Sequence, residues 1–140
     1  MELHEKNITS ISIPDTTGKG GGMLHYVPFD LGIAQRASGF ADTVIRLTET
    51  VRPLHIKPDG TAEGEDAAAL HEAEQEMLEA VNYVCGTVTA ADAFKNHRPF
   101  AMVGDSPWAA HVCHTITKIV SRLTKELYIA PHTMKQGRRK

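Results

Sequence analysis

The pattern of apolar and polar positions divides the chain into a short extended region followed by helices. Apolar and polar residues alternate around Ile11 and Ile13, which is the two-residue period of a strand with one buried face. A second extended run covers residues 23–31, and a glycine-rich stretch at residues 18–22 joins the two runs. Because glycine accepts positive φ angles, this stretch predicts the turn of a hairpin within residues 1–32.

Three longer stretches have the period of amphipathic helices. Helices are predicted over residues 33–51, 66–85 and 107–128, each with an apolar stripe along one side. Pro53 ends the first helix, and Gly86 stands where the second should have its left-handed C-terminal cap. The expected fold class is therefore α+β and mainly helical, with an N-terminal β-hairpin followed by three main amphipathic helices.

Shorter signals predict the connections between these elements. Residues 53–65 are rich in proline and glycine, which indicates a mobile linker on the surface. Thr89 is a candidate N-cap for a short helical turn at residues 90–94. Ser106 followed by Pro107 is typical of a helix start, with serine as the N-cap and proline at the first helical position.

The predicted elements fit one domain. A chain of 140 residues can bury one hydrophobic core. We expect residues 1–130 to form a single α+β domain and residues 131–140 to be a basic, disordered tail. The aromatic share is only 6%, so the core must rely on aliphatic residues, and a partner or a second copy of the chain would add burial.

The formal net charge of -2 conceals a separation of charge along the chain. From Asp59 to Glu79 every charged residue is acidic, whereas the charged residues of the stretch 135–140 are all basic. Glu72 and Glu76 would share an exposed helix face, which favours a solvated stripe over a catalytic carboxylate pair. The basic tail lacks interleaved aromatic residues, so nucleic acid is disfavoured as the main partner.

The cysteines and the apolar runs bear on the compartment. Cys85 and Cys113 are too few for a disulfide framework, and both fall on apolar helical stripes, where inert thiols belong. The N-terminus lacks the basic-then-apolar pattern of a signal peptide. No run approaches the ~18–20 apolar residues that span a bilayer. We therefore expect a cytoplasmic protein with reduced thiols and no membrane contact.

Two patterns resemble chemical motifs without completing them. The stretch Gly18–Gly20 is followed by a strand, whereas a phosphate-binding loop precedes a helix, so a hairpin tip is favoured. His111 and His114 would share a helix face and could bind one ion, but Cys113 points elsewhere and a second ligand pair is missing. None of the eight histidines has the sequence context of a catalytic triad. We expect no cofactor, no metal and no enzymatic activity.

The order of elements resembles a known family. Phe-Asp-Leu at residues 29–31 ends the hairpin, an amphipathic helix and a polar linker follow, and an acidic helix ends in Asn-Tyr-Val-Cys-Gly at residues 82–86. A short turn closing on Phe94 and a last amphipathic helix complete the order. Over residues 24–127 this layout resembles the small tail assembly chaperones of long-tailed bacteriophages, although Cys85 stands where that family usually has an aromatic residue.

The resemblance implies a protein-binding role without catalysis. Proteins of that family coat the tape measure protein and recruit tail tube subunits, often as a short form and a frameshifted longer form, and this chain would be the short form. It would act in the host cytoplasm, and homo-oligomers are a further expectation. The alternatives are a structural protein of the virion, at the tail or connector, and a small nucleic-acid-binding regulator that uses the basic C-terminal tail.

The last helix is the preferred contact element for a partner. Its apolar stripe would supply the partner-binding residues, and these are Trp108, Val112, Ile116, Ile119 and Leu123. A stripe of this kind equally fits the core of the chain itself, so both interpretations remain open from the sequence.

Overall fold

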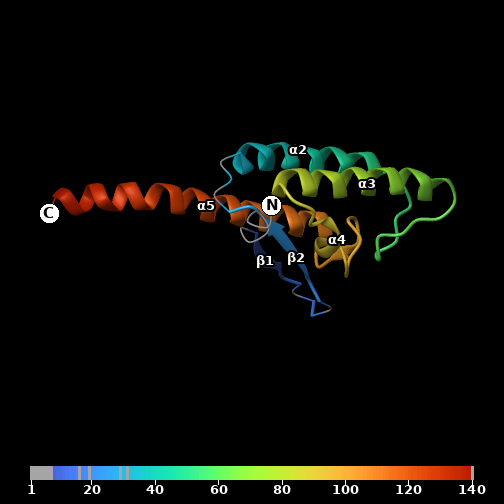
Figure 1. The fold of residues 1–140 in the computed structure, drawn as a ribbon. Helices are drawn as coiled ribbons and strands as arrows, with labels where there is room; N and C mark the ends of the chain where they lie inside the picture. The colour runs from blue at the N-terminus through green and yellow to red at the C-terminus, as the bar shows by residue number, and fades with distance from the viewer. Residues whose placement is uncertain (1–7, 16, 19, 29, 31, 140) are drawn as a thin grey trace.

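The computed structural model describes residues 8–139 apart from positions 16, 19, 29 and 31, with side chains as far as residue 125. The elements in chain order are β1 (Thr9–Ile13), β2 (Gly22–Tyr26), α2 (Ile33–Val51), α3 (Glu65–Cys85), α4 (Ala90–Ala93), β3 (Met102–Val103), β4 (Ser106–Pro107) and α5 (Trp108–Arg139). The expected fold class, a mainly helical α+β chain that begins with a hairpin, is confirmed (Figure 1).

The helices form one layer of neighbours and the hairpin packs to one side. Helices α2 and α3 run antiparallel to each other, and the first part of α5 packs against α2 (Figure 1). Strand β2 contacts α4, and strand β1 contacts α5. The remainder of α5 continues beyond the other elements and carries the C-terminus away from them (Figure 1).

The hairpin presents one apolar face to the core, as the alternation predicts. Its strands are antiparallel, with Ile11 opposite Leu24 and Ile13 opposite Gly22. Ile13 and Leu24 are fully buried. A Cβ atom on Gly22 would lie 2.5 Å from the carbonyl oxygen of Ala93, so this strand approaches α4 as closely as only glycine permits.

The second strand is shorter than the sequence pattern predicts. We expected extended structure over residues 23–31, but β2 ends at Tyr26. Pro28 lies just beyond it, and because proline has no amide hydrogen it cannot extend the ladder. Phe29 and Leu31, which the prediction included, lie outside the described residues.

Helices α2 and α3 begin and end where the apolar period predicts. On α2 the buried residues recur at helical spacing, and they are Ile33, Phe40, Val44, Leu47 and Val51. Gly86 closes α3 in the left-handed conformation, with φ of 74°, and its amide donates to the carbonyl of Asn82 over 3.0 Å. The predicted glycine cap is therefore confirmed.

The N-terminus of α4 is capped by a residue of another helix. Thr89 was expected to cap it, but its side chain makes no capping bond. The Thr89 hydroxyl instead accepts the amide of His25 over 2.7 Å. The amides of Thr89 and Ala90 donate to Asn82 Oδ1 over 2.7 and 2.8 Å, so a side chain of α3 supplies the cap.

The predicted helix start at Ser106 and Pro107 is wrong. These two residues form strand β4, which pairs with β3 so that Met102 lies opposite Pro107. Helix α5 begins at Trp108, whose backbone amide donates to the carbonyl of Ala101 over 2.8 Å. The loop thus satisfies the first helical amide, and no serine cap is required.

The C-terminal part of the chain also differs from expectation. We expected α5 to end near Tyr128, with a disordered tail beyond, yet the helical backbone continues through Pro131 to Arg139. The fixed φ of proline is itself helical, so a helix can continue past it, although proline removes one hydrogen bond and its ring crowds the carbonyl four residues earlier. Across the described residues, no helix is long and apolar enough to cross a membrane.

The segment 53–65 packs against the rest of the chain, where a mobile surface linker was expected. Ile56 and Ala62 are partly buried against the core, and Gly60 is buried. The amide of Met102 donates to the carbonyl of Pro58 over 2.8 Å, which attaches this segment to β3. Its prolines and glycines therefore shape a fixed turn.

Trp108 joins the helices to the loop that precedes α5. Its side chain is 0% exposed, and its Nε1–H donates to the carbonyl of Ala93 over 2.8 Å. The ring centroids of His97 and His111 lie 4.6 and 5.4 Å from the indole ring. A buried aromatic side chain with its polar atom satisfied contributes strongly to a core of this size.

Replacing this tryptophan tests its contribution. Trp108→Ala should lower the free energy of unfolding by about 3–5 kcal/mol, because it removes a large buried side chain and leaves the Ala93 carbonyl without its donor. Urea denaturation followed by circular dichroism measures the change. Val88→Ala is the control, since Val88 is 79% exposed and its loss should change stability by less than about 0.5 kcal/mol. Similar values for the two variants would contradict the prediction.

Candidate protein-binding groove

The apolar stripe of α5 fills the core of the chain. The expected contact residues are all at most 3% exposed, and they are Trp108, Val112, Ile116, Ile119 and Leu123. Of the two interpretations that the sequence left open, the core interpretation is the one confirmed. These side chains face α2 and the hairpin and do not form an exposed partner surface in this fold. A binding surface has to be sought elsewhere.

The acidic stripe predicted on α3 is exposed, whereas Glu74, a neighbour of the stripe in sequence, is buried. Glu72, Glu76 and Glu79 are exposed, and Glu76 forms an ion pair with Arg46 of α2. Glu74 is 6% exposed and accepts two hydrogen bonds from Arg98, over 3.0 and 2.8 Å. Sequence reasoning grouped Glu74 with the acidic run, although its place on the apolar side of the helix was a signal that it needed a partner.

The histidines of α5 do not converge with the cysteine. His111 Nε2 lies 2.8 Å from the carbonyl oxygen of Val103, Cys113 is half-buried, and His114 is exposed. Within the described residues, no three histidine, cysteine, aspartate or glutamate side chains are grouped as they would be to hold a metal ion. At the hairpin tip, Gly18 precedes a strand, and Lys19 lies outside the described residues.

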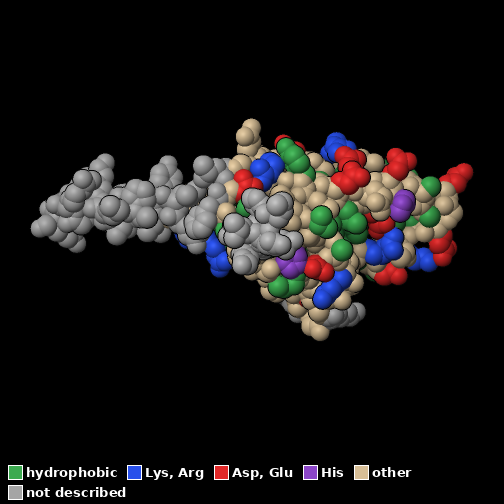
Figure 2. Space-filling view, in the orientation of Figure 1, with side chains coloured by type: hydrophobic (Ala, Val, Ile, Leu, Met, Phe, Trp, Pro, Cys, Tyr) green, Lys and Arg blue, Asp and Glu red, His purple; other side chains and the backbone are tan. Residues whose placement is uncertain are grey.

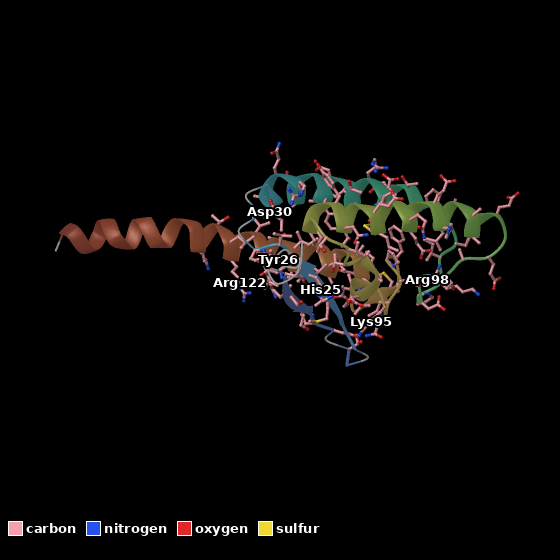
Figure 3. The ribbon with its side chains drawn as sticks, viewed as in Figure 1. His25, Tyr26, Asp30, Lys95, Arg98 and Arg122 are labelled. Carbon is pink, nitrogen blue, oxygen red and sulfur yellow. The ribbon has the colours of Figure 1, made fainter. Side chains whose placement is uncertain are left out.

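The structure assembles a Ser-His-Asp contact that the sequence did not reveal. His25 Nδ1 lies 2.6 Å from Ser10 Oγ, and His25 Nε2 lies 2.7 Å from Asp92 Oδ2. His25 lies on strand β2 (Figure 3). Ser10 faces it across the hairpin, whereas Asp92 belongs to α4. Asp92 is 55% exposed, so water competes for these bonds, and their evident effect is to fasten the hairpin to α4.

A second polar contact holds the hairpin tip to the loop before α5. Asp15 Oδ2 lies 2.9 Å from His97 Nε2, and the Asp15 side chain is only 1% exposed. Both the amide and the hydroxyl of Thr17 donate to the Asp15 carboxylate. The Thr17 hydroxyl is the largest of several causes that lower the pKa of Asp15 from 3.8 to about 2.

An apolar groove opens where the end of α2 meets this loop. It encloses about 380 Å³ and is lined by Thr48, Val51, Arg52, Leu54, Ile56, Lys57, Pro58, Phe100, Met102 and Pro107. Val51 and Phe100 are buried and form its floor, whereas Leu54 and Ile56 are half-buried. Met102 is 50% exposed at the edge. Segments about fifty residues apart in sequence therefore build one concave apolar surface.

The walls of the groove are held in place by backbone contacts. Besides the Met102–Pro58 hydrogen bond, the amide of Gly60 donates to the carbonyl of Lys57 over 2.8 Å. Gly60 has φ of 88°, and a Cβ atom there would lie 2.7 Å from the nitrogen of Ala101. Arg98 lies in the same loop (Figure 3), and its bidentate pair with Glu74 attaches that loop to α3. The groove is thus largely preformed.

Two cations stand at the rim of the groove. Arg52 pairs with Glu49 and Lys57 pairs with Glu63, each over 2.6 Å. All four side chains in these pairs are more than half exposed. Exposed pairs of this kind contribute at most about 1 kcal/mol, so either cation can exchange its partner at little cost. The other lining residues carry no charge.

A second groove lies between α2 and α3. It encloses about 480 Å³, and Gly39 and Ala80 keep it open while Tyr83 stands at its edge. Arg36 Nε donates to the carbonyl of Val84 over 3.2 Å, and its guanidinium lies 5.8 Å from the ring of Tyr83. Tyr83 is 69% exposed. Figure 2 shows charged side chains of both signs gathered over α2 and α3, with hydrophobic side chains between them.

Three comparisons with known proteins found no match. No protein-family model matches the chain. No protein of curated function matches it. No solved structure matches its fold.

The contribution of the Asp15 carboxylate to the stability of the fold should decrease at acidic pH. Its pKa is lower in the folded chain than its ordinary value, so the charged form stabilises the fold fully above pH 3.8 and ceases to do so near pH 2. Asp15→Asn should therefore destabilise the chain near neutral pH, with a difference from wild type that shrinks between these values. Urea denaturation over a pH series measures it. A difference in stability between Asp15→Asn and wild type that stays constant with pH would contradict the lowered pKa of Asp15.

The two thiols should differ in reactivity. Burial raises the pKa of Cys85 to about 12, and burial also raises the pKa of the half-buried Cys113. A disulfide reagent such as DTNB should modify Cys85 only when the chain unfolds, whereas Cys113 should react sooner. The Cys113→Ser variant isolates the slow thiol. Rapid labelling of this variant under native conditions would show that Cys85 is not held in the core.

Proposed function

We propose that this chain is a non-enzymatic adaptor that binds other proteins, in the manner of the tail assembly chaperones of long-tailed bacteriophages. The observation that carries the proposal is the open apolar groove between α2 and the loop before α5. Its floor is buried core, and the half-exposed Met102 stands at its edge. Preformed apolar concavities of this kind are common binding sites, because a partner that covers them removes apolar surface from water.

The form of α5 supports an adaptor role. This helix has 32 residues and is about 48 Å long at 1.5 Å per residue. Its last residue buried in the core, among those whose side chains are described, is Leu123. The part beyond continues away from the other elements (Figure 1). A projecting helix that the core does not cover is a suitable element for a second protein to pack against.

The resemblance supplies the identity of the partners under this proposal. The element order on which it depends, from the hairpin through an acidic helix and a short turn to a long final helix, is the order found in the fold. The partners would then be a tape measure protein and tail tube subunits, met in the host cytoplasm. A structural protein of the virion should be present in purified particles, whereas a chaperone should be absent from them.

Capture of tail proteins tests the proposal, and Met102→Glu tests the groove. The immobilised chain should retain the tape measure or tail tube protein encoded in the same gene cluster. Met102→Glu should weaken retention about tenfold or more, since it places a charge in the apolar contact. Val88→Glu is the matched control, because Val88 is also an exposed apolar residue and does not line the groove. Failure of the wild-type chain to retain either protein would contradict the proposed function.

A further inference from the structure

We infer that the groove selects an acidic amphipathic segment of its partner, in which an apolar side chain enters beside Met102 and a neighbouring carboxylate pairs with Lys57 or Arg52. This inference rests on the proposed function and names the chemistry of the partner at the same groove. It follows from three properties of the groove, which are its lining, the state of its rim cations and its rigidity.

The lining determines which kind of segment fits. The floor and one wall are apolar, through Val51, Phe100 and Ile56, and among the described residues the charged ones that line the groove are Arg52 and Lys57. A volume of about 380 Å³ is at the small end of ligand pockets and suits one or two side chains. A segment with apolar and acidic side chains next to each other would therefore complement both the floor and the rim.

The rim cations are available to a partner. The acidic groups that face them are Glu49 on the preceding turn of α2, Glu63 in the segment before α3, and the exposed Asp59, whose carboxylate interacts electrostatically with Lys57. Glu63 is 79% exposed and Glu49 is 57% exposed, so both are well solvated and can be replaced by another carboxylate. Binding would also partly cover these cations with apolar groups, and a charge pair with less exposure to water is stronger.

Charge elsewhere on the molecule directs an acidic segment to this groove. The outer face of α3 carries Glu72, Glu76 and Glu79, which repel an acidic partner. A basic segment would be attracted to that face and repelled by Arg52 and Lys57. Selectivity for charge therefore has an attractive element at the groove and a repulsive one on α3.

The preformed walls reduce the entropy that binding must overcome. The hydrogen bond of Met102 with Pro58 joins the two walls without a ligand, and the bond of Gly60 with Lys57 closes the turn within one wall. The Arg98–Glu74 pair fixes the loop behind them. Because little of the chain has to become ordered, a short segment can bind with measurable affinity.

Two synthetic peptides test the charge selectivity directly. One repeats Leu-Glu-Glu-Leu and the other repeats Leu-Lys-Lys-Leu, each labelled with fluorescein, so that they share length and apolar content. Fluorescence anisotropy with the full chain should show tighter binding of the acidic peptide. The double variant Arg52→Gln and Lys57→Gln should weaken that binding about fivefold, the change that corresponds to losing an exposed ion pair. Added salt should reduce the difference between the peptides.

Matched variants separate the groove from other surfaces. Arg46→Gln removes an exposed arginine of α2 that pairs with Glu76 and does not line the groove, so acidic-peptide binding should remain unchanged. Met102→Glu should weaken the acidic peptide more than the basic one, because the new charge repels it. Circular dichroism of each variant shows that the chain is still folded.

The results for the peptides and for the tail proteins can be told apart. Equal binding of the two peptides, no binding of the acidic one, or full binding by the double variant would each overturn the inference. If the wild-type chain still retains its tail proteins, and Met102→Glu still weakens that retention, the proposed function survives without the charge selectivity. If the wild-type chain fails to retain the tail proteins but still prefers the acidic peptide, the proposed partners are wrong and the charge selectivity of the groove is supported.

Discussion

The burial of Trp108 is the interaction on which the other parts of the fold depend. Its indole contacts the rings of His97 and His111 and donates from Nε1 to the carbonyl of Ala93, while its backbone amide donates to the carbonyl of Ala101. One side chain therefore connects α4, the loop before α5 and α5 itself. In a core with few aromatic residues, no smaller side chain could fill this volume and also donate to the carbonyl of Ala93.

Polar contacts then hold the loop and the hairpin around this centre. Glu74 anchors Arg98, Asp15 anchors His97, and Asp92 holds His25, each joining elements that are distant in sequence. Among the described residues, every buried side-chain nitrogen and oxygen has a hydrogen-bond partner. Such satisfied networks favour one arrangement of the loop, and the groove exists because that arrangement is fixed.

Local rules predicted helices α2 and α3 and the glycine cap of α3 well, and the N-terminal caps poorly. The periods of α2 and α3 located both helices to within a residue, because burial of a stripe is the main cause of helix formation in a small domain. Thr89 and Ser106 have the residue types of helix caps but serve other partners. The Thr89 hydroxyl accepts the amide of His25, a residue distant in sequence, whereas Ser106 pairs with Val103, three residues before it, in a short hairpin.

The sequence by itself determined the hairpin, helices α2 and α3 and the separation of acidic from basic segments, since each depends on neighbours within a few residues. Only the tertiary structure decided that the stripe of α5 is core, that Glu74 is buried with Arg98, and that Arg52 and Lys57 flank an apolar groove. These features require segments tens of residues apart to meet. Their meeting depends on how the whole chain packs, which no local period encodes.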